Sequence, residues 1–154
     1  MNSKILHYLK LNQNNYKELG AENFLWRIRN DPTSRKFSIN SDYINFENHK
    51  KWLNSKLQDN LQSVIYLCKF GNEKIGVVRF EKFSLENIYE VSIILAPEYR
   101  GYKISENLLS GALREFLKEY KSSEILAKIH MKNTSSKKLF ANLGFEKTDT
   151  YPSN

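Results

Sequence analysis

The sequence predicts a mixed α/β fold built on one sheet. Strand-like and helix-like segments alternate along the chain, three strand-like runs follow one another with only short turns between them, and a long amphipathic segment precedes a further strand-like run. Short turns favour antiparallel pairing, whereas a crossover through a helix favours a parallel, right-handed connection. The predicted sheet therefore contains both kinds of pairing.

The N-terminal part of the chain is predicted to contain a strand and two helices. Residues 4–11 alternate well enough for a strand, and residues 14–31 carry large apolar side chains in a helical pattern that Asp31 and Pro32 would end. Residues 45–58 place apolar side chains at steps of three or four, which is typical of a helix. The chain is thus expected to begin as strand, helix, helix.

The middle of the chain is predicted to form three antiparallel strands. Residues 63–70 and 73–83 are rich in β-branched and aromatic side chains, and Gly71 with Asn72 between them is a turn signal. Residues 87–96 form the next such run after a short connection. We therefore expect a meander in which each strand pairs with the one before it.

The C-terminal part is predicted to alternate helix and strand. Residues 104–120 carry apolar side chains on one helical face, and residues 124–131 form another strand-like run. The next helix would be capped by Asn133 or Thr134 and stopped by Gly144. The remaining residues supply at most one short strand.

Composition and charge limit the class of protein. The 154 residues suffice for a single domain spanning residues 1–154. No apolar run is long enough for a membrane span and no secretory signal is visible, so we expect a cytoplasmic chain that does not bind membranes. One cysteine and three dispersed histidines argue against a metal site. The net charge of +7 favours anionic partners, but the lysines are dispersed and no nucleic-acid-binding motif is present, so nucleic acid is not expected.

The turn at residues 99–105 is a candidate anion site. It joins the carboxyl end of a strand to the start of a long helix, where backbone N–H groups lack partners and the helix dipole is positive. Arg100 and Lys103 would add full charges, and Ser105 would add a hydroxyl donor. The alternative is an ordinary strand-to-helix turn with solvated side chains.

Two motifs resemble those of the GNAT superfamily of acetyl-CoA-dependent N-acetyltransferases. The segment "ILAPEYRGYKIS" is similar to the family's cofactor loop, with Arg100 on its Gln/Arg position. The segment "NTSSKKLFANLGF" is similar to the second family motif through Asn133, Ser136 and Phe140. This resemblance covers nearly the whole chain. It implies a GNAT-like mixed, mostly antiparallel sheet flanked by helices on both faces, with too few C-terminal residues for the family's last strand.

The resemblance implies that acetyl-CoA is the acetyl donor. A β-bulge in the strand "VSIILA" would separate it from its parallel neighbour and free backbone N–H groups near Ile94 and Leu95 for the thioester. Lys103 stands where the family has a glycine, so that it either crowds the phosphates or offers them its ammonium. The residues that the resemblance assigns to the cofactor are Ile94, Leu95, Arg100, Gly101, Tyr102, Lys103, Ile104, Ser105, Asn133, Ser136 and Phe140.

Acetyl transfer to an amine needs a base for the ammonium proton and an acid for the leaving thiolate. Glu90 is the carboxylate best placed to act as the base, and its alternative is a solvent-facing charge on a strand. Phe140 replaces the tyrosine that many family members use as the acid, and a phenylalanine cannot donate a proton. Water, Tyr99 or Tyr102 remain as candidates, and the acid is unassigned.

The acceptor is expected over the first two helices. The segments "LWRIRNDPTSRKFS" and "FENHKKWLNSKL" resemble two neighbouring GNAT groups, one acting on amino groups of nucleotide-linked sugars in surface-glycan pathways and one on N-termini of ribosomal proteins. A basic site favours an anionic, nucleotide-linked amino sugar as the small-molecule acceptor. The candidate acceptor-binding residues are Trp26, Arg29, Asn30, His49 and Trp52, and the alternative for the tryptophans is helix packing.

Two further alternatives follow from the departures from the family pattern. A non-catalytic CoA-binding or interaction module would retain the fold while lacking the acid and the loop glycines. The shortened C-terminus would leave a sheet edge that is either open or covered by a second subunit, so a homodimer is one expectation.

Overall fold

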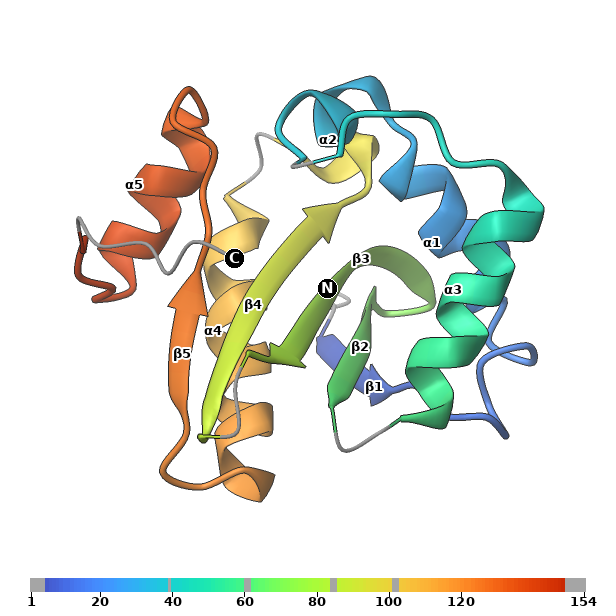
Figure 1. Cartoon of the computed structure of the whole chain (residues 1–154), viewed down its shortest axis with the longest axis horizontal. Helices are drawn as coiled ribbons and strands as arrows, with labels where there is room; N and C mark the ends of the chain where they lie inside the picture. The colour runs from blue at the N-terminus through green and yellow to red at the C-terminus, as the bar shows by residue number, and fades with distance from the viewer. Residues whose placement is uncertain (1–4, 39, 60–61, 84–85, 101–102, 149–154) are drawn as a thin grey trace.

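The computed structural model describes residues 5–38, 40–59, 62–83, 86–100 and 103–148. They form a five-stranded sheet in the order β1-β2-β3-β4-β5. The first four strands pair antiparallel, and β5 joins β4 in parallel (Figure 1), which confirms the predicted mixed sheet. The strands are β1 (Leu6–Lys10), β2 (Ser63–Phe70), β3 (Glu73–Lys82), β4 (Ile88–Leu95) and β5 (Glu124–Ala127).

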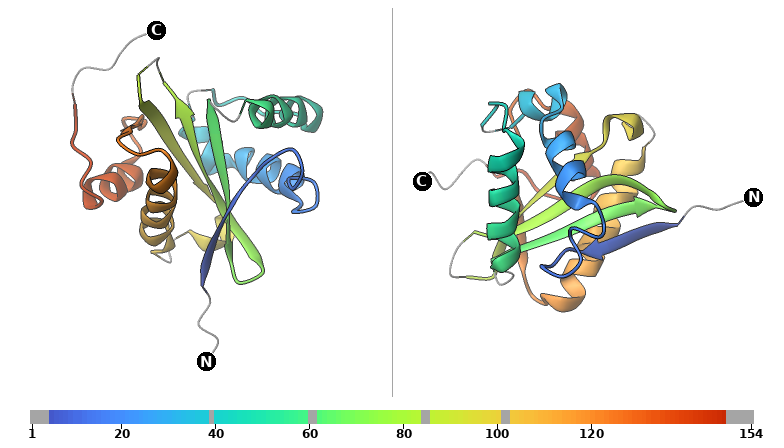
Figure 2. Two further views of the ribbon diagram at one scale, coloured as in Figure 1. Left: turned by 90° about the horizontal axis from the view of Figure 1, so that it is seen from below. Right: turned by 90° about the vertical axis from the view of Figure 1, so that its right-hand side faces the viewer.

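Helices cover both faces of the sheet, as predicted. Figure 2 shows α4 and α5 on one side and α1 and α3 on the other. None of the helices in the described part of the chain has the length and apolar character that a membrane span requires. The helices are α1 (Ala21–Arg29), α2 (Pro32–Lys36), α3 (Phe46–Gln58), α4 (Ile104–Glu119) and α5 (Thr134–Asn142), with a 3-10 turn, η1 (Pro97–Tyr99), after β4.

Strand alternation gives each face its own core. On the α4 side, Phe80 of β3 stacks on Phe116 of α4 with ring centroids 4.1 Å apart. On the other side, Val77 of β3 packs in a cluster with Ile28 of α1 and Leu53 of α3. Burying each large apolar side chain stabilises the fold by about 1.5–3 kcal/mol, so both helical layers are held mainly by these contacts.

Two predicted elements differ in extent. The helix expected over 14–31 begins only at Ala21, because Gly20 adopts a left-handed conformation (φ 69°) that interrupts it. Asp31 and Pro32 do not simply end this helix: Asp31 caps a separate short helix, α2, which the sequence reading missed. The strand expected over 124–131 is only Glu124–Ala127.

The C-terminal expectations hold in part. Asn133 caps α5 with its side chain, as predicted, and Gly144 follows the helix with φ 90°. Residues 145–148 form no strand, and the rest of the predicted short strand lies outside the described residues.

The predicted β-bulge in β4 is wrong. The β3–β4 register runs without a shift from Lys82↔Tyr89 to Gly76↔Leu95. The register shift lies in the β2–β3 pairing instead, where Cys68 pairs with Gly76 and Lys69 with Lys74, so that Ile75 of β3 is the extra residue. β4 and β5 separate for another reason: their pairing ends at Val91↔Ala127, while β4 continues to Leu95. The two strands diverge beyond that point (Figure 1).

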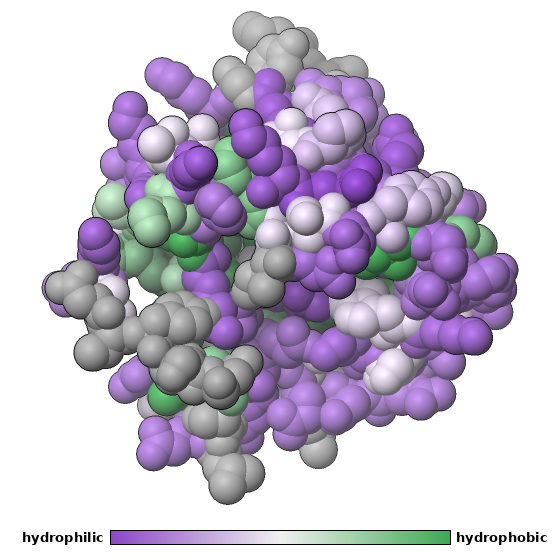
Figure 3. Space-filling model, turned by 45° about the horizontal axis from the view of Figure 1, so that its top comes forward, coloured by the Kyte–Doolittle hydropathy of each residue, from purple (hydrophilic) through white to green (hydrophobic). Residues whose placement is uncertain are grey.

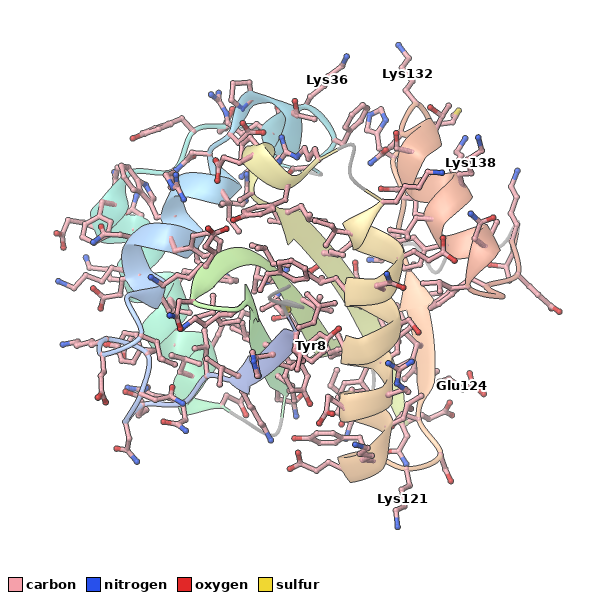
Figure 4. All side chains as sticks on the ribbon, turned by 180° about the vertical axis from the view of Figure 1, so that it is seen from behind. Tyr8, Lys36, Lys121, Glu124, Lys132 and Lys138 are labelled. Atoms are coloured by element: carbon pink, nitrogen blue, oxygen red, sulfur yellow. The ribbon has the colours of Figure 1, made fainter. Side chains whose placement is uncertain are left out.

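We expect Gly111→Ala to lower the free energy of unfolding by about 1–3 kcal/mol, because a methyl group there would overlap the Tyr8 hydroxyl. Tyr8 lies beside α4 (Figure 4) and donates to Leu108 O at 3.0 Å. The overlap should outweigh the gain of about 1 kcal/mol in helix propensity. Urea unfolding measures the change, and in a Tyr8→Ala background the same substitution should become stabilising. A loss of equal size in both backgrounds would show that Tyr8 is not the cause.

Candidate active site

The candidate active site is a cavity of about 680 Å³ at the point where β4 separates from β5. One wall is the second half of β4. A second wall comes from α1, α2 and α3, and a third from Lys128 to His130 and the first turns of α4 and α5. The site thus combines segments from both ends of the chain. Figure 3 shows this end of the molecule, where hydrophilic residues cover most of the surface and apolar residues show in patches between them.

Backbone groups of β4 are available along this cavity. Ala96 donates its N–H to Ile75 O at 2.8 Å. By the alternation of an antiparallel ladder, the N–H group of Ile94 also points toward β3. By strand alternation, Ile93 and Leu95 direct their N–H groups to the open side. Of the two predicted residues, only Leu95 therefore directs its backbone N–H to the open side of β4. The two-residue period of a strand indicates Ile93, not Ile94, as the second residue with such an N–H group.

The first turns of α4 and α5 both reach the cavity. Ser105 of α4 and Ser136 of α5 line it, and Ile104 begins α4. Helix N-termini carry partial positive charge and unpaired N–H groups, which suits anionic ligand groups. Asn133 also lines the cavity, but its Oδ1 accepts the Ser136 N–H at 3.1 Å and thereby caps the helix.

Lysines extend this positive end of the molecule. Lys36 of α2 and Lys132, which precedes α5, lie at the same end and point outward in Figure 4. Lys103 caps α4 in a left-handed backbone conformation (φ 57°, ψ 24°). The other two predicted loop residues, Gly101 and Tyr102, lie outside the described residues.

Arg100 ties the loop before α4 to α2. Its Nη1 donates to Asp31 Oδ2 at 2.5 Å, and its Nη2 donates to Ser34 Oγ at 3.0 Å and to Leu95 O at 2.9 Å. Burial would raise the pKa of Asp31, but hydrogen bonds from Arg100 and from the Ser34 backbone outweigh it, so that this pKa is lowered. The guanidinium of Arg100 is thus engaged within the protein, and its predicted role at the cofactor stays a prediction.

Glu90 lines the cavity from β4. Its Oε2 lies 3.7 Å from Lys128 Nζ, and its side chain is 29% exposed. Because Glu90 and Ile94 lie an even number of residues apart, they face the same side of the sheet, the side that α1 and α3 cover. The carboxylate therefore faces the cavity, and its role as the base stays a prediction.

Neither Phe140, at the family's acid position, nor the candidate acid Tyr99 offers a proton to the cavity, and the other candidate side chain, Tyr102, lies outside the described residues. Phe140 is buried, lies 5.0 Å from the Phe145 ring and offers only hydrocarbon to the cavity. Tyr99 lies in a separate hollow beside α1, where its hydroxyl donates to Glu73. This hydrogen bond, together with burial, raises the pKa of Tyr99 to about 12. Neither side chain serves as a proton donor in the described cavity.

The five predicted acceptor residues fall into two groups. Arg29, His49 and Trp52 line the cavity. Trp26 and Asn30 do not: Trp26 Nε1 donates to Ile44 O at 2.8 Å, and the Asn30 side chain both donates to and accepts from the Ile44 backbone. They hold the segment between α2 and α3 against α1, so their role in the described structure is packing.

The structure adds Arg79, which the sequence reading missed. Arg79 lies in β3, lines the cavity and places its guanidinium 5.0 Å from the centre of the Trp52 ring. The sequence pattern of β3 could have indicated Arg79, because a charged residue rarely shares a strand face with a core residue such as Val77. Burial, together with the charges of Arg29 and Arg79, lowers the pKa of His49 to about 4, so this imidazole is neutral.

We expect Lys103→Gly to raise the free energy of unfolding by about 1 kcal/mol, because glycine adopts a left-handed conformation without the steric cost of a Cβ. Lys103→Ala is the matched control, since it removes the ammonium but keeps the Cβ. Urea unfolding should show a gain for the glycine variant alone. Equal stabilities of the two variants would contradict the backbone argument. Calorimetry with acetyl-CoA on the same pair then separates crowding by the side chain from binding by the ammonium.

The sequence profile of the acetyltransferase (GNAT) domain matches residues 14–146. No curated protein matches the chain.

Solved structures are similar to it in fold. Spermidine N-acetyltransferase from Vibrio cholerae, in complex with CoA and spermine, superposes with a TM-score of 0.80 at 19% identity, over 93% of this chain and 82% of that one. A domain from Methanocaldococcus jannaschii has a TM-score of 0.74 at 23% identity, over 98% and 94% of the two chains. The ribosomal-protein-alanine N-acetyltransferase from Brucella melitensis has a TM-score of 0.70 at 20% identity, over 92% and 84%.

Proposed function

The chain belongs to the GNAT acetyltransferase family and is an N-acetyltransferase with acetyl-CoA as its donor; from this premise we propose that its acceptor is the amino group of a small anionic molecule, a nucleotide-linked amino sugar of surface-glycan biosynthesis. One observation carries the proposal. A single cavity is lined by a carboxylate, Glu90, by the open edge of β4 and by the cations Arg29 and Arg79.

The residues on the donor side fit acetyl-CoA. When bound, acetyl-CoA supplies an acetyl group on a thioester, whose thiolate is a good leaving group. The first turns of α4 and α5 offer positive helix ends to its phosphates. Ile93 and Leu95 present N–H groups on the open edge of β4, where they can bind the cofactor arm or an oxyanion.

Glu90 is the base in this proposal. An amine that enters as an ammonium must lose a proton before its lone pair can attack a carbonyl carbon. Glu90 accepts that proton, directly or through a water molecule, and Lys128 at 3.7 Å holds the carboxylate in place. The proton that the leaving thiolate needs comes from solvent, since a thiol pKa near about 8.5 makes a dedicated acid unnecessary.

The charge balance of the cavity supports an anionic acceptor. Arg100 is paired with Asp31, and Lys128 is paired with Glu90. Arg29 has no ion-pair partner among the described residues, so the acceptor end keeps a positive charge. A polycation would be repelled there, whereas a diphosphate would be attracted.

A thiol-release assay tests the proposal directly. The panel contains 4-amino nucleotide sugars, N-terminal peptides of ribosomal proteins, and polyamines. We expect turnover with the nucleotide sugars. Turnover with the peptides alone or the polyamines alone would overturn the acceptor assignment. Acetyl-CoA binding by calorimetry without turnover of any amine would instead favour a non-catalytic module.

A further inference from the structure

Three polar side chains from three elements meet at the acceptor end of the cavity. They are Arg29 of α1, His49 of α3 and Arg79 of β3, and all three line it. The Trp52 ring lies beside two of them, with its centre 5.0 Å from the Arg79 guanidinium and 5.3 Å from the His49 ring. This aromatic contact fixes the direction in which Arg79 points.

Two of these side chains carry buried nitrogen atoms without a partner. Arg29 Nη2 donates to Asn40 O at 2.8 Å, but Arg29 Nη1 is buried and finds no hydrogen-bond partner among the described residues. His49 is only 3% exposed, and its Nδ1 is likewise buried without a hydrogen-bond partner among the described residues. Buried polar atoms without partners are costly and rare in folded proteins, so a group outside the chain is the natural partner.

The electrostatics of this cluster indicate which group. Burial, together with the charges of Arg79 and Arg35, lowers the pKa of Arg29. One carboxylate pairs with the cluster: Glu81 Oε2 lies 3.7 Å from Arg79 Nη1, and Glu81 Oε1 is already bound by Lys56. The cluster therefore has more positive charge than the protein neutralises. An oxyanion would both accept the free N–H groups and offset this charge.

We propose that Arg29, His49 and Arg79 form a subsite that binds a carboxylate or phosphate oxyanion of the acceptor and so selects acceptors by their negative charge. That the oxyanion belongs to the acceptor rests on the proposed acetyl transfer. The binding of an oxyanion at these three side chains does not. Arg29 supplies Nη1 and His49 supplies Nδ1–H, while Arg79 supplies a second charge. The subsite binds by hydrogen bonds and charge alone, and no covalent step is involved.

The subsite lies close to Glu90 on the sheet. Arg79 pairs with Ser92 across the β3–β4 ladder, and Glu90 lies two residues from Ser92 on the same face. Such diagonal neighbours are about 7–8 Å apart. Glu90 and Arg79 therefore extend from neighbouring backbone positions, so one small molecule can carry both the amine and the oxyanion.

Steady-state kinetics of Arg29→Met test the subsite. We expect the KM for an anionic acceptor to rise about 10- to 100-fold, with the KM for acetyl-CoA unchanged, because one charge-assisted hydrogen bond is lost. Arg27→Met is the matched control: Arg27 lies on the same helix but faces the separate hollow, 3.9 Å from Glu98. If the two variants behave alike, the subsite is overturned. Arg79→Gln repeats the test where Arg29→Met does not fold.

A titration without acetyl transfer separates this inference from the proposed function. The imidazole signals of the three histidines are followed by NMR in the whole protein with inorganic pyrophosphate or tricarballylate, and His49→Gln assigns the relevant signal. Anion binding should raise the pKa of His49 above about 4, since the two arginine charges that lower it are offset. The rise should vanish in Arg29→Met and persist in Arg27→Met.

The results distinguish a failure of the subsite from a failure of the proposed function. Anion binding at His49 without acetylation of any amine upholds the subsite and overturns the proposed function. Acetylation of neutral amines with no response of His49 to either anion overturns the subsite. A response to pyrophosphate alone identifies a phosphate, and a response to tricarballylate alone identifies a carboxylate.

Discussion

Glu90→Gln is expected to lower kcat/KM for acetyl transfer by about 10²- to 10⁴-fold, the usual contribution of a general base. The amide keeps the size of the side chain in the cavity but cannot accept the proton of the incoming ammonium. The loss should shrink as the pH rises toward the pKa of the acceptor amine, because the amine then deprotonates without help. A thiol-release assay across pH measures both effects.

Glu124→Gln is the control for this result. Glu124 lies on the neighbouring strand and is exposed, so it changes the net charge by the same amount outside the cavity. Calorimetry with acetyl-CoA should give similar affinities for both variants. If Glu90→Gln reduces activity no more than Glu124→Gln does, Glu90 is not the base, and a water molecule or a group outside the described residues accepts the proton.

Asp31→Ala is expected to lower the free energy of unfolding by about 2–3 kcal/mol at pH 7, the sum of a lost helix cap and a partly buried ion pair. Asp31 Oδ2 accepts from the backbone N–H groups of Thr33 and Ser34 at 3.1 and 3.3 Å, and from Arg100 at 2.5 Å. The estimate stays below that of a fully buried pair because the Arg100 side chain is 30% exposed. Urea unfolding measures the loss.

The effect of Asp31 should depend on pH in a known direction. Its pKa is lowered in the folded protein, so its contribution is present above its unfolded pKa, near 3.8, and is lost as the pH falls through the folded value. Wild type and Asp31→Ala should therefore converge in acid. Asp42→Ala, at an exposed position, is the control, and a loss as large as that of Asp31→Ala would contradict the role of the ion pair.

The sequence predicted those parts of the fold that local chemistry determines. The hairpin at Gly71, the apolar face of α4 and the Asn133 cap follow from side chains within a few residues of each other. The predictions were wrong where one residue pattern fits two structures. Pro32 was read as the end of a helix, but proline lacks an N–H and is equally suited to the first turn of the next helix, α2.

The strand separation shows a second limit. A bulge was expected in β4 because a bulge is one local way to separate two strands. In the structure β4 keeps a regular register with β3 while β5 ends early, at Ala127. Residues 128–130, which follow β5, line the cavity, and no residue pattern within "EILAKIHM" marks where the strand ends.

The sequence by itself determined the two motifs, the helix start at Ile104, the strand that carries Glu90, and the helices that carry Arg29 and His49. Only the tertiary structure decided which of these residues share a cavity: it included Trp52, left Trp26 in a packing role, and added Arg79 from β3. It also joined Arg100 to Asp31, which lie 69 residues apart. The physical reason is that composition and periodicity act over a few residues, whereas the meeting of distant side chains depends on how whole helices pack on the sheet.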